Sequence, residues 1–212
     1  MAHFTREHWI LMGFNALYIL GFGLYYLLEQ NLEFLWYVLV MVFFFVVLVV
    51  LMRQAQFPTP LLWGLSLWGL LHMAGGGVRI DDHVLYAQML LPLVERGDLM
   101  LLKYDQVVHM YGFAVATFLS HHLMIRYVQP AKRGFAYFLL VALAGTGFGV
   151  LNEIVEFIAV LVVEDTGVGG YYNIALDLVF NTLGATIAAI LIYRFGKKLP
   201  VVTEPVREPV VT

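Results

Sequence analysis

The chain has 212 residues, of which 61% are hydrophobic and 13% are charged, and its formal net charge is −3. This composition excludes an ordinary soluble domain, in which about 25% of residues are charged, and it indicates an integral membrane protein. There is no cysteine, which excludes disulfides, thiolate metal ligands and cysteine nucleophiles. We expect membrane lipid as a partner and no nucleic acid.

The apolar stretches predict six transmembrane helices. A spanning helix needs about 20 mainly apolar residues. In chain order, the stretches that qualify cover residues 9–28, 34–52, 57–78, 105–127, 134–152 and 178–193. The predicted fold is therefore all-α, a polytopic bundle of six helices over residues 1–199, followed by a disordered cytoplasmic tail over 200–212.

The distribution of basic residues predicts the topology, because Lys and Arg are enriched in cytoplasmic loops. One side of the predicted bundle holds Arg6, Arg53, Arg126, Lys132, Arg133, Arg194, Lys197, Lys198 and Arg207. The other side holds only Arg79, Arg96 and Lys103, all in a long loop at about 77–103. Both termini are therefore expected in the cytoplasm and this loop outside. Its apolar part, 84–94, is too short to span and contains Pro92, so we expect an interfacial or re-entrant segment.

The last three predicted helices carry one shared pattern when each is followed inward from its outer end. A carboxylate comes first, then a His or Asn, then two small residues, at offsets of 0, 4, 7 and 11. At 3.6 residues per turn these positions form one narrow stripe on each helix. The stripes are Asp105, His109, Gly112 and Ala116; Glu156, Asn152, Gly149 and Gly145; and Asp177, Asn181, Gly184 and Ala188. Small residues in such a stripe favour close helix packing.

The carboxylates Asp105, Glu153, Glu156 and Asp177 lie within or at the ends of predicted spans. A charge near the bilayer centre costs about 2.5–3.5 kcal/mol on insertion scales, and less towards the interface. Only Lys103 lies near enough in sequence to offset them. The pattern therefore indicates shared protons, a bound cation or a water-filled cavity. The alternative is that these groups only hydrogen-bond helices together or lie among lipid headgroups.

Histidines and carboxylates without cysteine make a ligand set that suits zinc, manganese, iron, magnesium or calcium better than copper(I). The candidate metal ligands are His72, Asp105 and His109. The candidate acids or bases are Glu153, Glu156 and Asp177, with Asn152 and Asn181 as cofactor-binding partners. Asp81, Asp82 and His83 fit a solvated loop that could also cap the site.

Four segments resemble known bacterial membrane families. HMAGG at 72–76, Asp105 with His109, and NEIVE at 152–156 are similar to the inner-membrane family typified by YjdF. DLVFNTLG at 177–184 resembles the VanZ-like family. Gln106 stands where YjdF-like proteins usually carry arginine. The resemblance covers roughly residues 72–190 and implies a six-span inner-membrane protein concerned with the cell envelope or lipid-linked compounds.

Three functions fit these observations. The first is a hydrolase or transferase, metal-dependent or using a His/carboxylate acid–base pair, that acts on a cell-envelope lipid or lipid-linked substrate from the extracytoplasmic side. The second is a proton- or cation-coupled carrier or binding protein for a lipid headgroup or small solute. The third is a structural or accessory membrane subunit. The substrate and the oligomeric state do not follow from the residues.

Overall fold

The computed structural model describes residues 4–96, 99–130, 133–164 and 166–196. These residues form six long helices, which confirms the predicted all-α fold. The helices are α1 (Arg6–Leu28), α2 (Leu32–Ala55), α3 (Thr59–Gly77), α4 (Tyr104–Leu123), α5 (Phe135–Val162) and α6 (Tyr171–Phe195). A π-helical turn at Met124–Val128 extends α4. The predicted tail over 200–212 lies outside the described residues.

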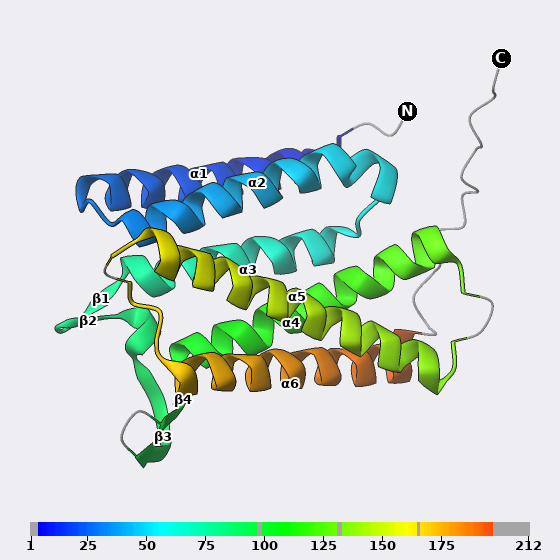
Figure 1. The fold of residues 1–212 in the computed structure, drawn as a ribbon. Helices are drawn as coiled ribbons and strands as arrows, with labels where there is room; N and C mark the ends of the chain where they lie inside the picture. The colour runs from blue at the N-terminus through cyan, green and yellow to red at the C-terminus, as the bar shows by residue number, and fades with distance from the viewer. Residues whose placement is uncertain (1–3, 97–98, 131–132, 165, 197–212) are drawn as a thin grey trace.

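The helices pack into one bundle whose two ends differ (Figure 1). At one end α1 begins and α6 ends; we call this the terminal end. The opposite end carries two small β-hairpins, and we call it the hairpin end. Helix α4 is central, because it contacts α3, α5 and α6.

Local signals in the sequence set several helix boundaries. The Asn31 side chain caps α2 by accepting a hydrogen bond of 3.0 Å from the Phe34 amide, which satisfies a free N–H of the first turn. At the other end of α2, Gln56 adopts a left-handed conformation with φ of 49°, a common way to end a helix. Proline in the first turn of α3 fits the start of that helix.

By length and composition, α1, α2, α5 and α6 are apolar enough to cross a membrane. Their outward faces carry large apolar side chains, such as Leu39 and Phe43 of α2, which are 64% and 62% exposed. Such faces suit lipid contact. Helix α3 carries Ser66 and His72, and α4 carries three histidines.

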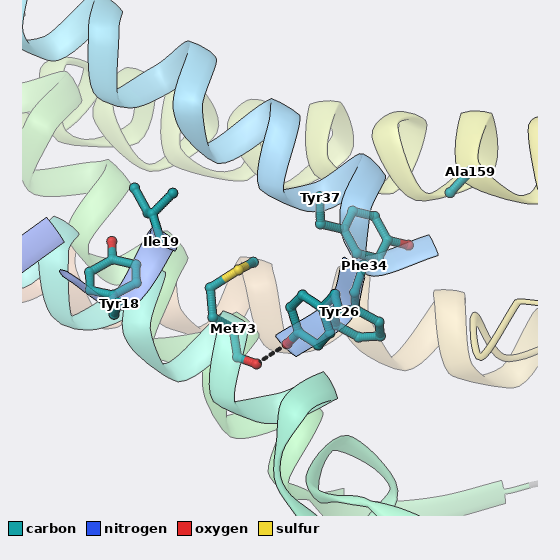
Figure 2. Packing of buried hydrophobic residues seen from close by; sticks show 7 residues of the cluster. All are labelled: Tyr18, Ile19, Tyr26, Phe34, Tyr37, Met73 and Ala159. Carbon is teal, nitrogen blue, oxygen red and sulfur yellow. Dashed lines mark hydrogen bonds between the residues drawn. The ribbon is translucent and has the colours of Figure 1, made fainter. Parts of the chain in front are cut away.

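The first half of the chain packs through an aromatic core between α1, α2, α3 and α5 (Figure 2). Tyr26 is fully buried there, and its hydroxyl donates a hydrogen bond to the backbone carbonyl of Met73. A second contact joins α1 to α3, where Asn15 Nδ2 donates to Ser66 Oγ at 2.7 Å. Helices in lipid associate through such close packing and hydrogen bonds. These contacts fix α3 against α1 and α2.

The segment between α3 and α4 differs in kind from the rest of the fold. It forms β1 (Arg79–Ile80), β2 (His83–Val84), a 3₁₀ turn at Leu85–Ala87, β3 (Met89–Arg96) and β4 (Leu99–Lys103). Strands β1 and β2 form one antiparallel hairpin, and β3 and β4 form the other. The expected interfacial or re-entrant segment at 84–94 is thus mostly strand, although between Met89 and Val94 the pairing with β4 is interrupted.

Gln106 fastens the second hairpin to the start of α4. Its Oε1 accepts hydrogen bonds from the amides of Leu102 and Lys103 at 2.6 and 3.2 Å. Its Nε2 donates to the carbonyl of Met100 at 2.8 Å. The side chain is fully buried. All three hydrogen bonds go to backbone groups of β4, so the role of Gln106 is to hold that strand.

Helices α5 and α6 are longer than the predicted spans. The predicted fifth span stops at 152 because charged residues follow, whereas α5 continues to Val162. The predicted sixth span begins at 178, whereas α6 begins at Tyr171. The reason is that the carboxylates face other helices and do not interrupt the helical backbone. Glu153, Glu156 and Asp177 therefore lie inside helices.

Candidate functional site

His109 is the centre of a polar cluster near the hairpin end. The imidazole projects from α4 and its side chain is only 4% exposed. Around it lie Asp105 of α4, Glu153 and Glu156 of α5, and Asp177 of α6. We call these five residues the His109 cluster. All five were singled out from the sequence, and the structure brings them together.

The two ring nitrogens of His109 face different carboxylates. Nε2 lies 3.4 Å from Asp105 Oδ1 and 3.7 Å from Glu156 Oε1. Nδ1 lies 3.5 Å from Glu153 Oε1. The imidazole is therefore surrounded by negative charge from its own helix and from α5.

Asn181 selects the tautomer of His109. Its Oδ1, which can only accept, lies 3.0 Å from His109 Nδ1, so Nδ1 carries a proton and donates it. Its Nδ2 donates to Glu153 Oε1 at 3.2 Å, and the side chain is fully buried. With a cation bound, the imidazole would be neutral and would offer the lone pair of Nε2, which faces Asp105 and Glu156. Such fixing of the second nitrogen is typical of histidine ligands to metals.

Asn173 organises the other side of the cluster and was missed in the sequence. Its Nδ2 donates to Asp177 Oδ2 at 2.7 Å and lies 3.3 Å from Asp105 Oδ2. Its Oδ1 accepts a hydrogen bond from Lys103 Nζ. Asn173 lies four residues before Asp177, which itself lies four before Asn181, so one face of α6 supplies all three. That spacing is the signal that could have identified it.

The cluster has more carboxyl groups than cationic partners. The ion pairs of its carboxylates, within the described part of the chain, involve only His109 and Lys103, whose Nζ is 4.0 Å from Asp105 Oδ2. Two buried carboxylate oxygens, Glu153 Oε2 and Asp177 Oδ1, have no hydrogen-bond partner there. A buried charge without a partner is strongly unfavourable. The arrangement therefore calls for additional positive charge, as a cation or as protons.

The ligand atoms converge closely enough to share a cation. Two sets of three converge: Asp105, His109 and Asp177, and His109, Glu153 and Glu156, with the atoms of each set within 4.8 Å of one another. Ligands of a tetrahedral zinc ion, each at 2.0–2.1 Å, lie roughly 3.3 Å apart. The separations of 3.4 and 3.7 Å at His109 Nε2 are close to this value. His109 belongs to both sets and is their only nitrogen donor.

His72 lies apart from the converging atoms. Its Nδ1 is 2.5 Å from the hydroxyl of Tyr86 in the loop, and its ring packs against that of Tyr37. Burial, with the nearby charges of Asp105 and Glu156, raises the pKa of the Tyr86 phenol well above its usual value. The neutral phenol therefore donates to His72 Nδ1. His72 thus binds Tyr86 of the loop, and it belongs to neither converging set among the described residues.

On α5 both Asn152 and Glu153 contact members of the cluster or its partners. Asn152, predicted as a binding partner, donates from Nδ2 to Glu156 Oε1 at 2.8 Å, whereas Glu153, which lies off the predicted stripe, contacts Asn181. The buried positions of α5 run through Gly145, Gly149 and Glu153. At 100° per residue, a step of four turns the helix by about 40° and a step of three by about 60° the other way. Measured from Gly145, position 152 lies about 20° and position 153 about 80° around an ideal helix, so the burial of Glu153 does not follow from ideal helix spacing.

The small residues of the stripes allow close helix approach, as predicted. A Cβ on Gly149 would lie 2.8 Å from the Asn181 side chain, and a Cβ on Gly184 would collide with the backbone carbonyl of Met110 on α4. Helices α4, α5 and α6 can therefore approach closely only because these positions lack side chains. That approach brings His109 within reach of Asn181.

Glu33 is a further buried carboxylate that the sequence analysis missed. Its Oε2 accepts a hydrogen bond of 2.6 Å from the amide of Gly167, in the connection between α5 and α6, and its Oε1 lies 3.4 Å from the Tyr37 hydroxyl. It therefore ties the start of α2 to that connection.

The loop residues Asp81, Asp82 and His83 are exposed in the turn region of the first hairpin. His83 Nε2 lies 3.1 Å from Gln88 Oε1, a contact within the loop.

The fold and the cluster define a helical membrane protein with a buried His/carboxylate site. The chain matches the family of predicted membrane proteins designated DUF2238 over residues 8–198, and it belongs to that family. No curated protein matches the chain. No solved structure matches it either.

Proposed function

We propose that this membrane protein binds a divalent cation at the His109 cluster and acts as a hydrolase or transferase on a cell-envelope lipid or lipid-linked substrate. The observation that carries the proposal is the pair of buried, unpartnered carboxylate oxygens around a histidine whose Nε2 lies 3.4 and 3.7 Å from two further carboxylates. Imidazole with carboxylates suits zinc or manganese first, and magnesium or calcium next.

The contacts suggest distinct roles. Asp105, His109 and Asp177 form the set with the most buried members and are the proposed ligands. The side chain of Glu156 is 13% exposed and is the proposed general base, because it borders the partly accessible edge of the cluster. Glu153 is 8% exposed and hydrogen-bonded to Asn181, so its proposed role is to position the amide that holds His109. A bound divalent cation would supply Lewis acidity and a water activated at neutral pH.

The location belongs to the same proposal. The chain would cross the bacterial cytoplasmic membrane six times, with the hairpin end outside. The excess of Lys and Arg in the segments at the terminal end supports this orientation. The resemblance to YjdF-like and VanZ-like proteins, with its link to the cell envelope, supports the substrate class.

Glu156→Gln is expected to abolish turnover while cation binding remains, because the amide keeps the size of the side chain but cannot take up a proton. The full chain would be purified, loaded with zinc or manganese and incubated with an extract of bacterial envelope lipids, with products followed by mass spectrometry. Glu29→Gln, an exposed glutamate between α1 and α2, is the matched control. Equal product formation by Glu156→Gln would contradict the assigned base, and no product from the wild type would contradict the enzyme.

A cation-coupled carrier is the second candidate, favoured by the burial of His109 and Asp177, which are 4% and 0% exposed. Carriers must enclose the coupling ion, and intramembrane ionisable residues often mark ion pathways. Uptake of the cation into vesicles that contain the wild-type protein, lost in Asp177→Asn, would favour the carrier over the enzyme.

Asn181→Ala is expected to weaken cation binding about 10- to 100-fold, the usual effect of removing a group that orients a ligand. The affinity would be measured by calorimetry on the purified protein. Asn152→Ala is the matched control, because Asn152 bonds only Glu156 within the described contacts, and we expect a smaller loss. Equal affinities in Asn181→Ala and wild type would show that Asn181 does not orient His109.

A further inference from the structure

The second hairpin, β3 with β4, has an irregularity that exposes apolar residues. Met89 lies opposite Lys103, and Val94 opposite Leu101. Between these pairs β4 has the single residue Leu102, whereas β3 has Leu90, Leu91, Pro92 and Leu93. Leu102 has a φ of 75°, in the left-handed region. We call residues 90–93 the apolar bulge.

The side chains of the apolar bulge are exposed. Leu90, Leu91 and Leu93 are 44%, 56% and 63% exposed, although they are among the most hydrophobic residues of the loop. The bulge occupies a hairpin that extends away from the bundle beside the start of α6 (Figure 1). Exposed apolar residues that are clustered in this way mark a contact with lipid or with another protein.

The position of the hairpin indicates which contact applies. β4 contacts α6, and α6 begins with Tyr171 and Tyr172, which are 80% and 51% exposed. Exposed tyrosines at the end of a membrane helix mark the boundary between lipid and water. The apolar faces of α5 and α6 continue from there towards the terminal end, with Leu161 and Val179 exposed by 66% and 51%. The bulge therefore lies at the edge of a surface that is already lipid-facing.

From these observations we propose that the apolar bulge inserts into the lipid leaflet at the hairpin end, with its leucines among the upper acyl chains. The insertion is shallow, because a bulge leaves backbone groups outside the strand ladder, and these groups need water or headgroups as partners. Because β4 ends at Lys103 and α4 begins at the next residue, the inserted hairpin also places the outer edge of the His109 cluster at headgroup level. This inference does not depend on a cation or on catalysis.

The experiment uses the absence of cysteine in the chain. Single-cysteine variants Leu91→Cys and Leu93→Cys of the full chain carry a nitroxide spin label in vesicles of phosphatidylethanolamine and phosphatidylglycerol. Collision rates with oxygen, which is concentrated in lipid, and with a water-soluble nickel chelate report the depth of the label. Leu39→Cys on the exposed face of α2 is the lipid reference, and Asp82→Cys in the exposed turn of the first hairpin is the water reference.

We expect a several-fold excess of oxygen over nickel collisions at both leucine positions, between the value at Leu39 and the value at Asp82 and closer to Leu39. Adding Leu93→Asp to the Leu91→Cys variant should shift the label towards nickel, because a carboxylate disfavours insertion. A nickel-dominated ratio at both positions, as at Asp82, would overturn the proposal. Low collision rates with both reagents would also overturn it, because they would show that protein, such as a second copy of the chain, covers the bulge.

Discussion

His109→Ala is expected to eliminate divalent-cation binding and, with it, the stability that the cation confers. His109 is the only nitrogen donor of the cluster and belongs to both sets of converging ligand atoms. A cation present at about 100 times its Kd stabilises a protein by about 2.7 kcal/mol. Thermal unfolding of the purified protein, with and without zinc or manganese, should therefore show a cation-dependent shift in the wild type and none in the variant.

His122→Ala is the matched control for this experiment. His122 lies on the same helix, and its Nε2 is 2.7 Å from the carbonyl oxygen of Ala55, which ends α2 near the terminal end. The variant loses one hydrogen bond but no member of the cluster, so the cation-dependent shift should persist. A shift that survives in His109→Ala would show that the cation binds elsewhere.

Gly184→Ala is expected to destabilise the bundle and to weaken cation binding together. The added methyl group would collide with the backbone carbonyl of Met110, and a backbone atom cannot move aside as a side chain can. Overpacking of this kind costs about 1–3 kcal/mol. Because Met110 follows His109 and Gly184 lies one turn from Asn181, separating α4 from α6 also lengthens the hydrogen bond of 3.0 Å that holds the imidazole.

Unfolding of the purified variant in detergent, followed by circular dichroism, measures this effect. Gly147→Ala is the control, because a Cβ there meets no atom within 4 Å. Replacing a helical glycine without a clash should be neutral or stabilise by up to about 1 kcal/mol. Equal stability of Gly184→Ala and Gly147→Ala would mean that α4 and α6 do not approach as closely as the structure shows.

The sequence predicted the helices and all five residues of the His109 cluster for physical reasons that are easy to state. Apolar stretches long enough to span a membrane are a strong signal, and carboxylates within them stand out. The shared spacing in α4 and α6 placed Asp105 with His109 and Asp177 with Asn181. In both helices a step of four residues keeps side chains on one face.

The remaining features depend on how helices cross and on where they end. On α5 the buried residues include Gly145, Gly149 and Glu153, four apart, whereas the spacing shared with α4 and α6 selected Asn152 in place of Glu153. Asn173 was missed because the predicted span began after it. The hairpins of the long loop were missed because short strands at a helix end leave only a weak periodic pattern.

Metal analysis of the purified wild-type protein tests the central claim most directly. The full chain would be extracted in mild detergent, supplied separately with zinc, manganese, magnesium and calcium, freed of excess ion and measured by mass spectrometry of the elements, beside Asp177→Asn. We predict close to one divalent cation per chain in the wild type and a large loss in Asp177→Asn that retains its helical fold. A wild-type protein that retains none of these cations would contradict the site, and its buried carboxylates would then have to be neutralised by protons.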